Sequence, residues 1–326
     1  MKITACAPAN IAFIKYWGKK DDVLRLPLNS SISMNLSGCF TETTVEFDQE
    51  YKEDEVAMVG EEISEKEKKR ITAHLSRIRE LAKLSDFVQV ATRNNFPKSS
   101  GIASSASGFA ALTLAGTRAA GLVLSERDLS ILARIGSGSA CRSVPSGFVE
   151  WKYGGKGDDS YAYSLYPHTY WDLRDIIVIV KTSEKKIGST EGMENVWSSP
   201  FFPARLKDVK NKIKKIKEAL KKKNFKLLGE TTEEEAINMH SVMMTQRPPL
   251  FYWDEGTMEI IRAVQDWREQ GLSVYFTIDA GPNVHLIAEG KNEKEVVRRV
   301  NFLKNIKEII INRPARGARL TKDNLF

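Results

Sequence analysis

The sequence has few cysteines and no long apolar run. Its three cysteines, Cys6, Cys39 and Cys141, form an odd set without CxxC or Cys/His metal-ligand spacing, which argues against a disulfide scaffold and a zinc site. No window approaches about 18 uninterrupted apolar residues, so we expect no membrane-spanning helix. These features predict a reducing, cytoplasmic compartment.

Signals for secretion and for flexible linkers are also absent. Pro8 and Asn10 interrupt the apolar N-terminal segment, and no small-residue cleavage site follows it, so we read no secretion signal. We find no internal repeat, no low-complexity tract and no long Pro/Gly linker. The 326 residues correspond to roughly two domains of about 150 residues each, and 42% hydrophobic residues suffice for two cores.

Motifs of several common enzyme classes are missing. No Gly-Lys-Ser/Thr sequence completes a Walker A loop, and neither GxSxG nor a Cys/His nucleophile signature occurs. The histidines show no paired metal-ligand spacing; they are His74, His168, His240 and His285. A metal centre and a covalent nucleophile are therefore poorly supported, and Cys141 is better explained as a packing residue.

The charge is moderately positive but does not identify a partner. Lys and Arg number 49 against 42 Asp and Glu, a net charge of +7 that permits an anionic ligand of any size. The most basic segment, residues 206–229, has apolar residues every three or four positions and predicts an amphipathic helix. Its lysine-rich face is compatible with nucleic-acid binding, but the lack of interleaved aromatics or arginines favours a solvated surface.

Periodicity predicts a mixed α+β chain in two abutting halves, a first domain of residues 1–183 and a second of residues 184–326. We expect strands at 2–7, 31–36, 41–47, 86–92, 148–152, 176–181, 273–278, 284–288 and 308–311. We expect helices at 61–83, 101–122, 126–135, 203–223, 225–243 and 256–270.

Small residues fill 97–108 (PKSSGIASSASG), between a predicted strand and an apolar helix. Four N–H groups at a helix N-terminus lack intrahelical partners, and the helix dipole favours an anion there. A triphosphate would suit this position. Close helix packing explains the same composition equally well.

A second small-residue segment, 136–143 (GSGSACRS), presents Arg142. Small neighbours let a guanidinium approach a carboxylate or phosphate through two parallel hydrogen bonds, a geometry that lysine cannot supply. Arg142 is therefore a candidate for binding a substrate carboxylate, with a surface salt bridge as the alternative.

Two further segments present charged residues at the ends of apolar runs. In 275–283 (YFTIDAGPN), Asp279 follows a predicted strand and precedes a Gly-Pro turn, which places it to face a cleft or to form an Asx-turn. In 7–19 (APANIAFIKYWGK), Lys15 follows an apolar run and must either reach solvent or have a buried partner.

In series, the segments APANIAFIKYWGK, NNFPKSSGIASSASG, ARIGSGSACRS with GFVEW, and DAGPN resemble the diphosphomevalonate decarboxylases of the GHMP kinase superfamily, over residues 4–321. The resemblance implies an α+β fold with an N-terminal domain like domain 2 of ribosomal protein S5, a ferredoxin-like C-terminal domain and an active site in the cleft between them. It implies ATP- and Mg²⁺-dependent phosphorylation of the 3-hydroxyl of mevalonate 5-diphosphate. Loss of phosphate and carbon dioxide then gives isopentenyl diphosphate.

The resemblance also implies roles for individual residues. Asp279 would orient or deprotonate the 3-hydroxyl, Lys15 would counter charge beside it, and Arg142 would hold the C1 carboxylate. Around the substrate's phosphates and carboxylate it places Asn10, Tyr16, Lys19, Ser139, Ser189 and Thr190. Around the ATP phosphates it places Pro97, Ser100, Gly101, Ala103, Ser104 and Ser105, with Ser105 as the candidate Mg²⁺ contact.

Departures from the family pattern leave alternatives open. Thr190 stands where some bacterial relatives carry an arginine, a cation that would suit a terminal phosphate. Mevalonate 5-phosphate is therefore an alternative substrate, and a 3-kinase that does not decarboxylate is an alternative activity. A nucleic-acid-binding protein is the alternative from another class. Our main prediction is a homodimeric enzyme of isoprenoid biosynthesis without nucleic-acid or membrane partners.

Overall fold

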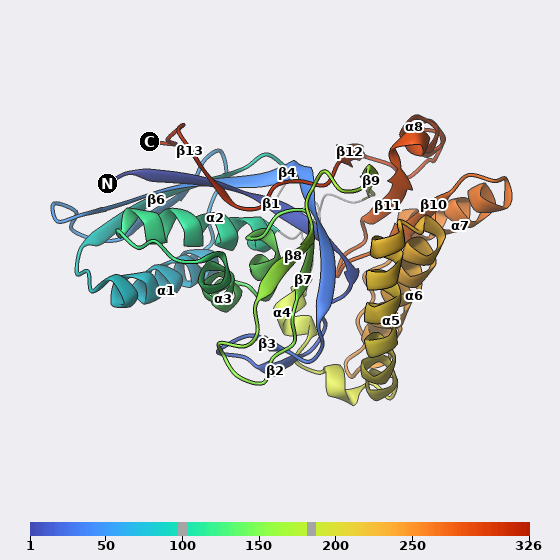
Figure 1. The fold of residues 1–326 in the computed structure, drawn as a ribbon, viewed down its shortest axis with the longest axis horizontal. Helices are drawn as coiled ribbons and strands as arrows, with labels where there is room; N and C mark the ends of the chain where they lie inside the picture. The colour runs from blue at the N-terminus through green and yellow to red at the C-terminus, as the bar shows by residue number, and fades with distance from the viewer. Residues whose placement is uncertain (97–103, 181–186) are drawn as a thin grey trace.

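The computed structural model of the chain describes residues 1–96, 104–180 and 187–326. These residues form one sheet of seven strands, one of four strands and a separate pair of short strands (Figure 1). Helices pack against both larger sheets, so the predicted α+β class is confirmed. Among the described helices, none combines the length and apolar character needed to cross a bilayer.

Two long antiparallel strands form the centre of the seven-stranded sheet. β1 (Ile3–Ile14) pairs with β4 (Ser31–Asp48) from Ile3 opposite Val45 to Ile14 opposite Ile32. We expected two strands in the second region. One continuous strand forms because β1 pairs with it on both sides of a register shift near Pro8, which absorbs the irregularity between the two predicted runs. The remaining strands are β5 (Glu55–Met58), β6 (Phe87–Asn94), β7 (Phe148–Trp151), β8 (Ala162–Tyr166) and β13 (Arg319–Thr321).

Helices cover one face of this sheet, and the first of them begins at a capping box formed by Ser64 and Glu67. These helices are α1 (Glu65–Ala82), α2 (Ser104–Ala119), α3 (Glu126–Gly136) and the 3₁₀ helix η1 (Gly138–Ser143). Alanine and glycine are frequent in α2, which lets it lie close against β1 and β4.

The four-stranded sheet is buried on both faces. Its order is β10 (Val274–Thr277), β11 (Val284–Glu289), β9 (Leu173–Ile179) and β12 (Glu308–Asn312), all antiparallel. Ile177 and Ile179 of β9 join a core with α5 (Phe202–Lys222) and α6 (Phe225–Thr245). Ile176 and Val178 point to the opposite face, toward α7 (Glu255–Glu269) and α8 (Glu293–Val300). The continuous β-branched run thus forms a doubly buried strand, as its composition predicted.

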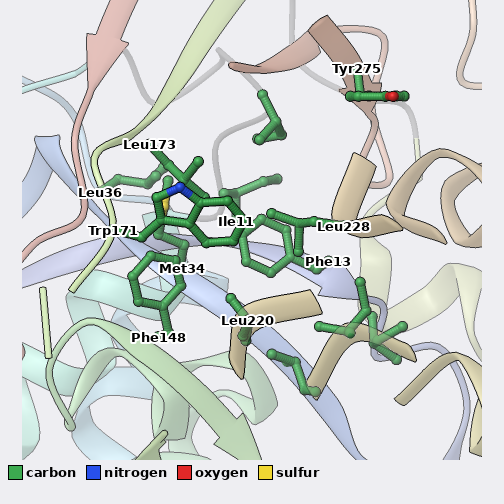
Figure 2. Close-up of a cluster of buried hydrophobic side chains, with 14 of the residues drawn as sticks. Ile11, Phe13, Met34, Leu36, Phe148, Trp171, Leu173, Leu220, Leu228 and Tyr275 are labelled. Carbon is green, nitrogen blue, oxygen red and sulfur yellow. The ribbon is translucent and has the colours of Figure 1, made fainter. Parts of the chain in front are cut away.

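One hydrophobic core joins the two halves of the molecule. Ile11, Phe13 and Met34 from the larger sheet lie in the same cluster as Leu173 from the smaller sheet and Leu220 from α5 (Figure 2). Because apolar burial contributes about 25 cal/mol per Å², this shared core resists separation of the halves. It holds the larger sheet and the α5–α6 pair in a fixed relation.

The strands of the two sheets do not separate at a single position in the chain. β9 begins at Leu173, ahead of the predicted division after residue 183, and already belongs to the smaller sheet. Near the C-terminus, β13 returns to the larger sheet and pairs with β1. Short elements complete the fold; they are β2 (Lys19–Asp21), β3 (Leu26–Pro27), α4 (Ser189–Gly192), η2 (Val196–Ser198) and η3 (Gly290–Asn292).

Candidate active site

A cleft of about 1010 Å³ opens where the end of β1, the start of α2, η1, α4 and the turn after β10 come together. The predicted site residues that line it are Lys15, Tyr16, Ser104, Ser105, Ser139, Arg142, Ser189, Thr190 and Asp279. Segments far apart in sequence therefore meet at one cavity. Pro97, Ser100, Gly101 and Ala103 lie outside the described residues.

Asp279 and Lys15 form an ion pair across the cleft. Lys15 Nζ lies 2.6 Å from Asp279 Oδ1, with the Lys15 side chain 2% exposed and the Asp279 side chain 28% exposed. The turn after β10 holds Asp279 through its main chain, since its carbonyl oxygen lies 2.8 Å from the Gly281 amide nitrogen and 3.1 Å from His240 Nε2. The buried lysine thus has the partner that its apolar surroundings require.

The carboxyl group of Asp279 is held ionised. Burial alone raises its pKa, but the positive charge of Lys15, supported by His285 and Arg142, outweighs burial and lowers the pKa to about 2. Conversely, burial lowers the pKa of His240 to about 3, so this ring is neutral. A neutral ring whose Nε2 carries the proton donates to the Asp279 carbonyl oxygen.

Arg142 is fixed from behind by polar side chains. Its Nε donates to Asn10 Oδ1 at 3.1 Å and its Nη1 to Ser31 Oγ at 2.8 Å. Asn10 Nδ2 in turn donates to Ser143 Oγ at 2.9 Å. The Nη2 atom of Arg142 finds no hydrogen-bond partner in the described part of the chain, which leaves a donor for a ligand in the cleft. Asn10 therefore supports Arg142 instead of lining the cavity.

Tyr16 and η1 pack closely on one wall. A Cβ atom at Gly138 would lie 2.7 Å from the Tyr16 ring, so only glycine fits at this position. The Tyr16 ring also packs against Trp151, with 4.6 Å between centroids. Burial raises the pKa of the Tyr16 phenol, and its buried hydroxyl has no partner among the residues described. The phenol is therefore neutral, and its hydroxyl is a buried donor without a partner among those residues.

The start of α2 lines both the cleft and a second cavity. Ser105 Oγ lies 3.1 Å from Ser137 Oγ, and both serines line the cleft. Ser104 and Ser105 also line a neighbouring cavity of about 620 Å³, whose walls include the apolar side chains of Ile71 and Phe109. The same two serines thus border a polar cleft and a more apolar cavity.

For Lys19 and Arg25, the lining of the cleft differs from the set of site residues that the sequence predicted. Lys19 does not line the cleft; it lies on β2 and forms an ion pair with Asp22. Arg25 lines the cleft although no motif contains it. Only the fold of the β2–β3 hairpin brings Arg25 there, and a lone arginine in a loop gives no sequence signal.

The cleft suits an anionic ligand that carries its own metal ion. Its charged lining residues are Lys15, Arg25, Arg142 and Asp279, an excess of positive charge. Within residues 1–96, 104–180 and 187–326, no group of three or more His, Cys, Asp or Glu side chains is arranged to hold a metal ion. Mg²⁺ commonly binds through substrate phosphates with few protein ligands, and the hydroxyls of Ser104, Ser105 and Ser137 fit that mode.

Family models match both halves of the chain. The diphosphomevalonate decarboxylase-like N-terminal domain matches residues 7–162, and the mevalonate 5-diphosphate decarboxylase C-terminal domain matches residues 175–319. The diphosphomevalonate decarboxylase of Debaryomyces hansenii is 36% identical over 314 residues, covering 90% of this chain and 81% of the relative. The Homo sapiens enzyme of that name is 36% identical over 304 residues, covering 86% and 75%.

Solved structures give the same result over nearly the full length. The mevalonate diphosphate decarboxylase from Staphylococcus aureus superposes with a TM-score of 0.94 at 37% identity, covering 98% of both chains. MDDEF in complex with MVAPP, AMPPCP and magnesium superposes with a TM-score of 0.93 at 37% identity, covering 99% of both chains. By sequence and by fold, this chain belongs to the diphosphomevalonate decarboxylase family.

Proposed function

We propose that the chain catalyses the ATP-dependent decarboxylation of mevalonate 5-diphosphate to isopentenyl diphosphate, releasing ADP, phosphate and carbon dioxide. The observation that carries this proposal is the cleft in which the Lys15–Asp279 ion pair and Arg142 face the serines at the start of α2. The Lys15–Asp279 ion pair suits a reacting hydroxyl, Arg142 suits a carboxylate, and the serines suit phosphates. Membership of the family supplies the substrate that carries all three groups.

Asp279 orients the 3-hydroxyl and receives its proton. A carboxylate with a pKa of about 2 is a weak base, so its main contribution is a hydrogen bond that aims the hydroxyl oxygen at the phosphorus. Phosphoryl transfer passes through a loose transition state that needs little nucleophilicity. As the new O–P bond forms, the hydroxyl proton passes to the Asp279 carboxylate, and Lys15 keeps that carboxylate in place.

Arg142 holds the carboxylate that is lost. Its fixed guanidinium aligns the C1–C2 bond with the C3–O bond of the phosphorylated intermediate. The C3–O electrons leave with phosphate, and the C1–C2 electrons form the new double bond as carbon dioxide departs. Positive charge develops at C3 during this step, so the buried walls formed by Trp17 and Met239 help by excluding water.

The start of α2 is the proposed place for the nucleotide. Its N-terminal serines, Ser104 and Ser105, would bind the phosphates, and the adjoining apolar cavity with Phe109 would take the base. When bound, ATP supplies the phosphoryl group and Mg²⁺ neutralises the charge of the phosphates. Ser189 and Thr190 of α4, which also line the cleft, are proposed contacts of the substrate.

The direct test combines the protein with ATP, Mg²⁺ and mevalonate 5-diphosphate and follows ADP and carbon dioxide together. We expect equal amounts of both products and their loss, by a factor of about 10² or more, in Asp279→Asn, with ATP affinity retained. Asp266→Asn, at an exposed position of α7, is the matched control and keeps full activity. ADP without carbon dioxide would indicate a 3-kinase, and no turnover would overturn the proposal.

The nucleic-acid alternative has less support from the lysine-rich helix than its composition suggested. In α5, Lys212 is buried against Glu235, and Lys217 lies 2.7 Å from Glu150. Such pairing reduces the charge available to a phosphate backbone. A salt-sensitive shift with RNA that survives Asp279→Asn but disappears when Lys214 and Lys215 are neutralised would revive this alternative.

We also propose a cytoplasmic location and a homodimer. Cys6, Cys39 and Cys141 are free and buried, which suits a reducing compartment and supports the first proposal. Fractionation of the source cells tests it. The homodimer is a prediction from the family resemblance, and sedimentation equilibrium of the purified chain decides it.

A further inference from the structure

Arg25 occupies an unusual backbone conformation at the edge of the cleft. It lies just before β3 and has a φ of 49°, one of three positive φ angles at non-glycine residues among those described. L-residues adopt this left-handed region rarely, because Cβ crowds the backbone there. The short connection between β2 and β3 therefore places Arg25 in a backbone conformation that few residues adopt.

One edge of the Arg25 guanidinium is already bound. Its Nε donates to the main-chain oxygen of Ile135 at 2.9 Å, near the C-terminus of α3. Carbonyl groups in the last turn of a helix lack intrahelical donors and carry the negative end of the dipole, so they suit a cation. This contact fixes the position and the direction of the planar group.

The other edge of the guanidinium is free for a ligand. Arg25 is only partly buried and lines the cleft, and its Nη1 and Nη2 find no partner in the part of the chain that the structure describes. Two parallel N–H groups of this kind bind a carboxylate or phosphate through paired hydrogen bonds. Arg25 is therefore built to bind an anion.

The other cations of the cleft already have assignments. Lys15 is paired with Asp279, and Arg142 is held by Asn10 and Ser31 where the substrate carboxylate is proposed to bind. No carboxylate within 1–96, 104–180 and 187–326 forms an ion pair with Arg25. Its charge thus remains for a further anionic group of the substrate or of ATP.

One neighbour of Arg25, Tyr16, is a residue that the family resemblance places around the substrate's phosphates. Arg25 is close enough to Tyr16 for its charge to lower the pKa of the phenol against the larger, opposite effect of burial. Tyr16 packs on Gly138, and its hydroxyl is an unpaired buried donor among the described residues. Thr190, which also lines the cleft, has no charge. Arg25 thus places a cation beside Tyr16 in the cleft.

We propose that Arg25 binds the 5-diphosphate of the substrate and makes the enzyme prefer mevalonate 5-diphosphate to mevalonate 5-phosphate. The proposal rests on the proposed function, because it assigns one group of that substrate. The inner phosphate is common to both compounds. An arginine that binds the outer phosphate therefore strengthens the binding of mevalonate 5-diphosphate but not of mevalonate 5-phosphate.

Steady-state kinetics of Arg25→Gln test the proposal in the full-length chain. With saturating ATP and Mg²⁺, we expect the KM for mevalonate 5-diphosphate to rise about tenfold or more, as loss of a charge-assisted hydrogen bond predicts. We expect the KM for ATP to change less than about twofold. The ratio of kcat/KM for the 5-diphosphate to that for the 5-phosphate should fall about tenfold. If the wild type does not turn over mevalonate 5-phosphate, the inhibition constant of this compound against mevalonate 5-diphosphate is measured instead of its kcat/KM.

Two variants control the experiment. Arg25→Lys keeps the charge but loses the paired donors, so it should show a smaller rise in KM, and it serves as the test if Arg25→Gln does not fold. Arg316→Gln changes an exposed arginine that does not line the cleft and should behave as the wild type. Thermal melting of each variant shows whether it is folded.

Three results would overturn the assignment of Arg25. A rise in the KM for ATP that exceeds the rise for the substrate would place Arg25 on the nucleotide. If kcat/KM fell equally for the 5-diphosphate and the 5-phosphate, Arg25 would have no role in discriminating between them. If the KM for mevalonate 5-diphosphate did not change, Arg25 would not contact the substrate. Failure of the wild type to turn over either compound would instead overturn the proposed function.

Discussion

At the scale of single residues, the ionisation of Asp279 depends on its contact with Lys15. That contact is an ion pair of 2.6 Å, and it opposes the tendency of burial to raise the pKa of the carboxyl group. We therefore predict that Lys15→Met raises the pKa of Asp279 above about 2, since burial then acts with less opposition. Protonation would inactivate the carboxylate at a higher pH than in the wild type.

The measurement is the pH dependence of kcat between about pH 4 and pH 8 for the wild type and Lys15→Met. We expect the acidic limb of the profile to move to higher pH in the variant. If the variant is inactive, ¹³C NMR of the Asp279 carboxyl group reports the same titration. An unchanged carboxyl titration would contradict the coupling. Lys215→Met, at an exposed position of α5, is the control.

A second residue-scale prediction concerns the shape of the Arg142 side chain. Arg142→Lys keeps the charge but loses the planar group that Asn10 and Ser31 hold. We expect kcat/KM for mevalonate 5-diphosphate to fall about 10²-fold with the KM for ATP unchanged. Near wild-type activity would show that charge alone is sufficient. Arg298→Lys, exposed on α8, is the matched control.

At the scale of elements, the α5–α6 pair supports the strand that carries Lys15. Arg205 of α5 lies 2.5 Å from Glu235 of α6, and both side chains are no more than 1% exposed. Arg205 also donates to the main-chain oxygens of Lys15 at 3.1 Å and Trp17 at 3.3 Å. A buried ion pair thus connects two helices to the end of β1.

This arrangement predicts a large cost for removing one partner. Glu235→Gln leaves Arg205 buried without its counter-charge, and we expect a loss of about 3–5 kcal/mol in the free energy of unfolding. Glu218→Gln, in an exposed pair with Lys222 on α5, should leave stability nearly unchanged. Urea denaturation measures both variants. If both variants lost a similar free energy of unfolding, the buried Arg205–Glu235 pair would contribute no more to stability than an exposed pair.

Elements differed in how well the sequence predicted them. Long amphipathic helices such as α1 and α5 were predicted to within a few residues, because one face must be apolar over many turns. The short strands β2, β3, β5, β8 and β13 were missed. Strands of two to five residues carry almost no periodic signal, and they form because a neighbouring strand supplies their hydrogen bonds.

At the scale of the whole molecule, acid should destabilise the fold through buried histidines. His74 Nε2 lies 2.8 Å from Thr113 Oγ1 between α1 and α2, and burial lowers the pKa of His74 to about 3. The unfolded chain binds a proton near the ordinary value of about 6.5. Between these values the unfolded state carries one more proton, so stability falls as the pH falls from about 6.5 toward 3.

The corresponding test compares the wild type with His74→Gln in urea at several pH values between about pH 4 and pH 7. The wild-type free energy of unfolding should fall more steeply with acid, by about 1.4 kcal/mol per pH unit for the one extra proton. Gln cannot titrate but still provides a hydrogen-bonding group for Thr113. Identical pH slopes would contradict the assignment.

The sequence by itself determined the α+β class, most helices and the family, because periodicity and ordered motifs are local properties of the chain. It also singled out Lys15, Arg142 and Asp279. The division after residue 183 and the roles of the site residues stay predictions. The family resemblance placed Lys15 beside Asp279, and the structure shows their ion pair. Only the tertiary structure decided that Asn10 contacts Arg142 and that Arg25 lines the cleft. These contacts join residues distant in sequence, and they depend on a shared hydrophobic core that fixes the two sheets and the β2–β3 hairpin in space.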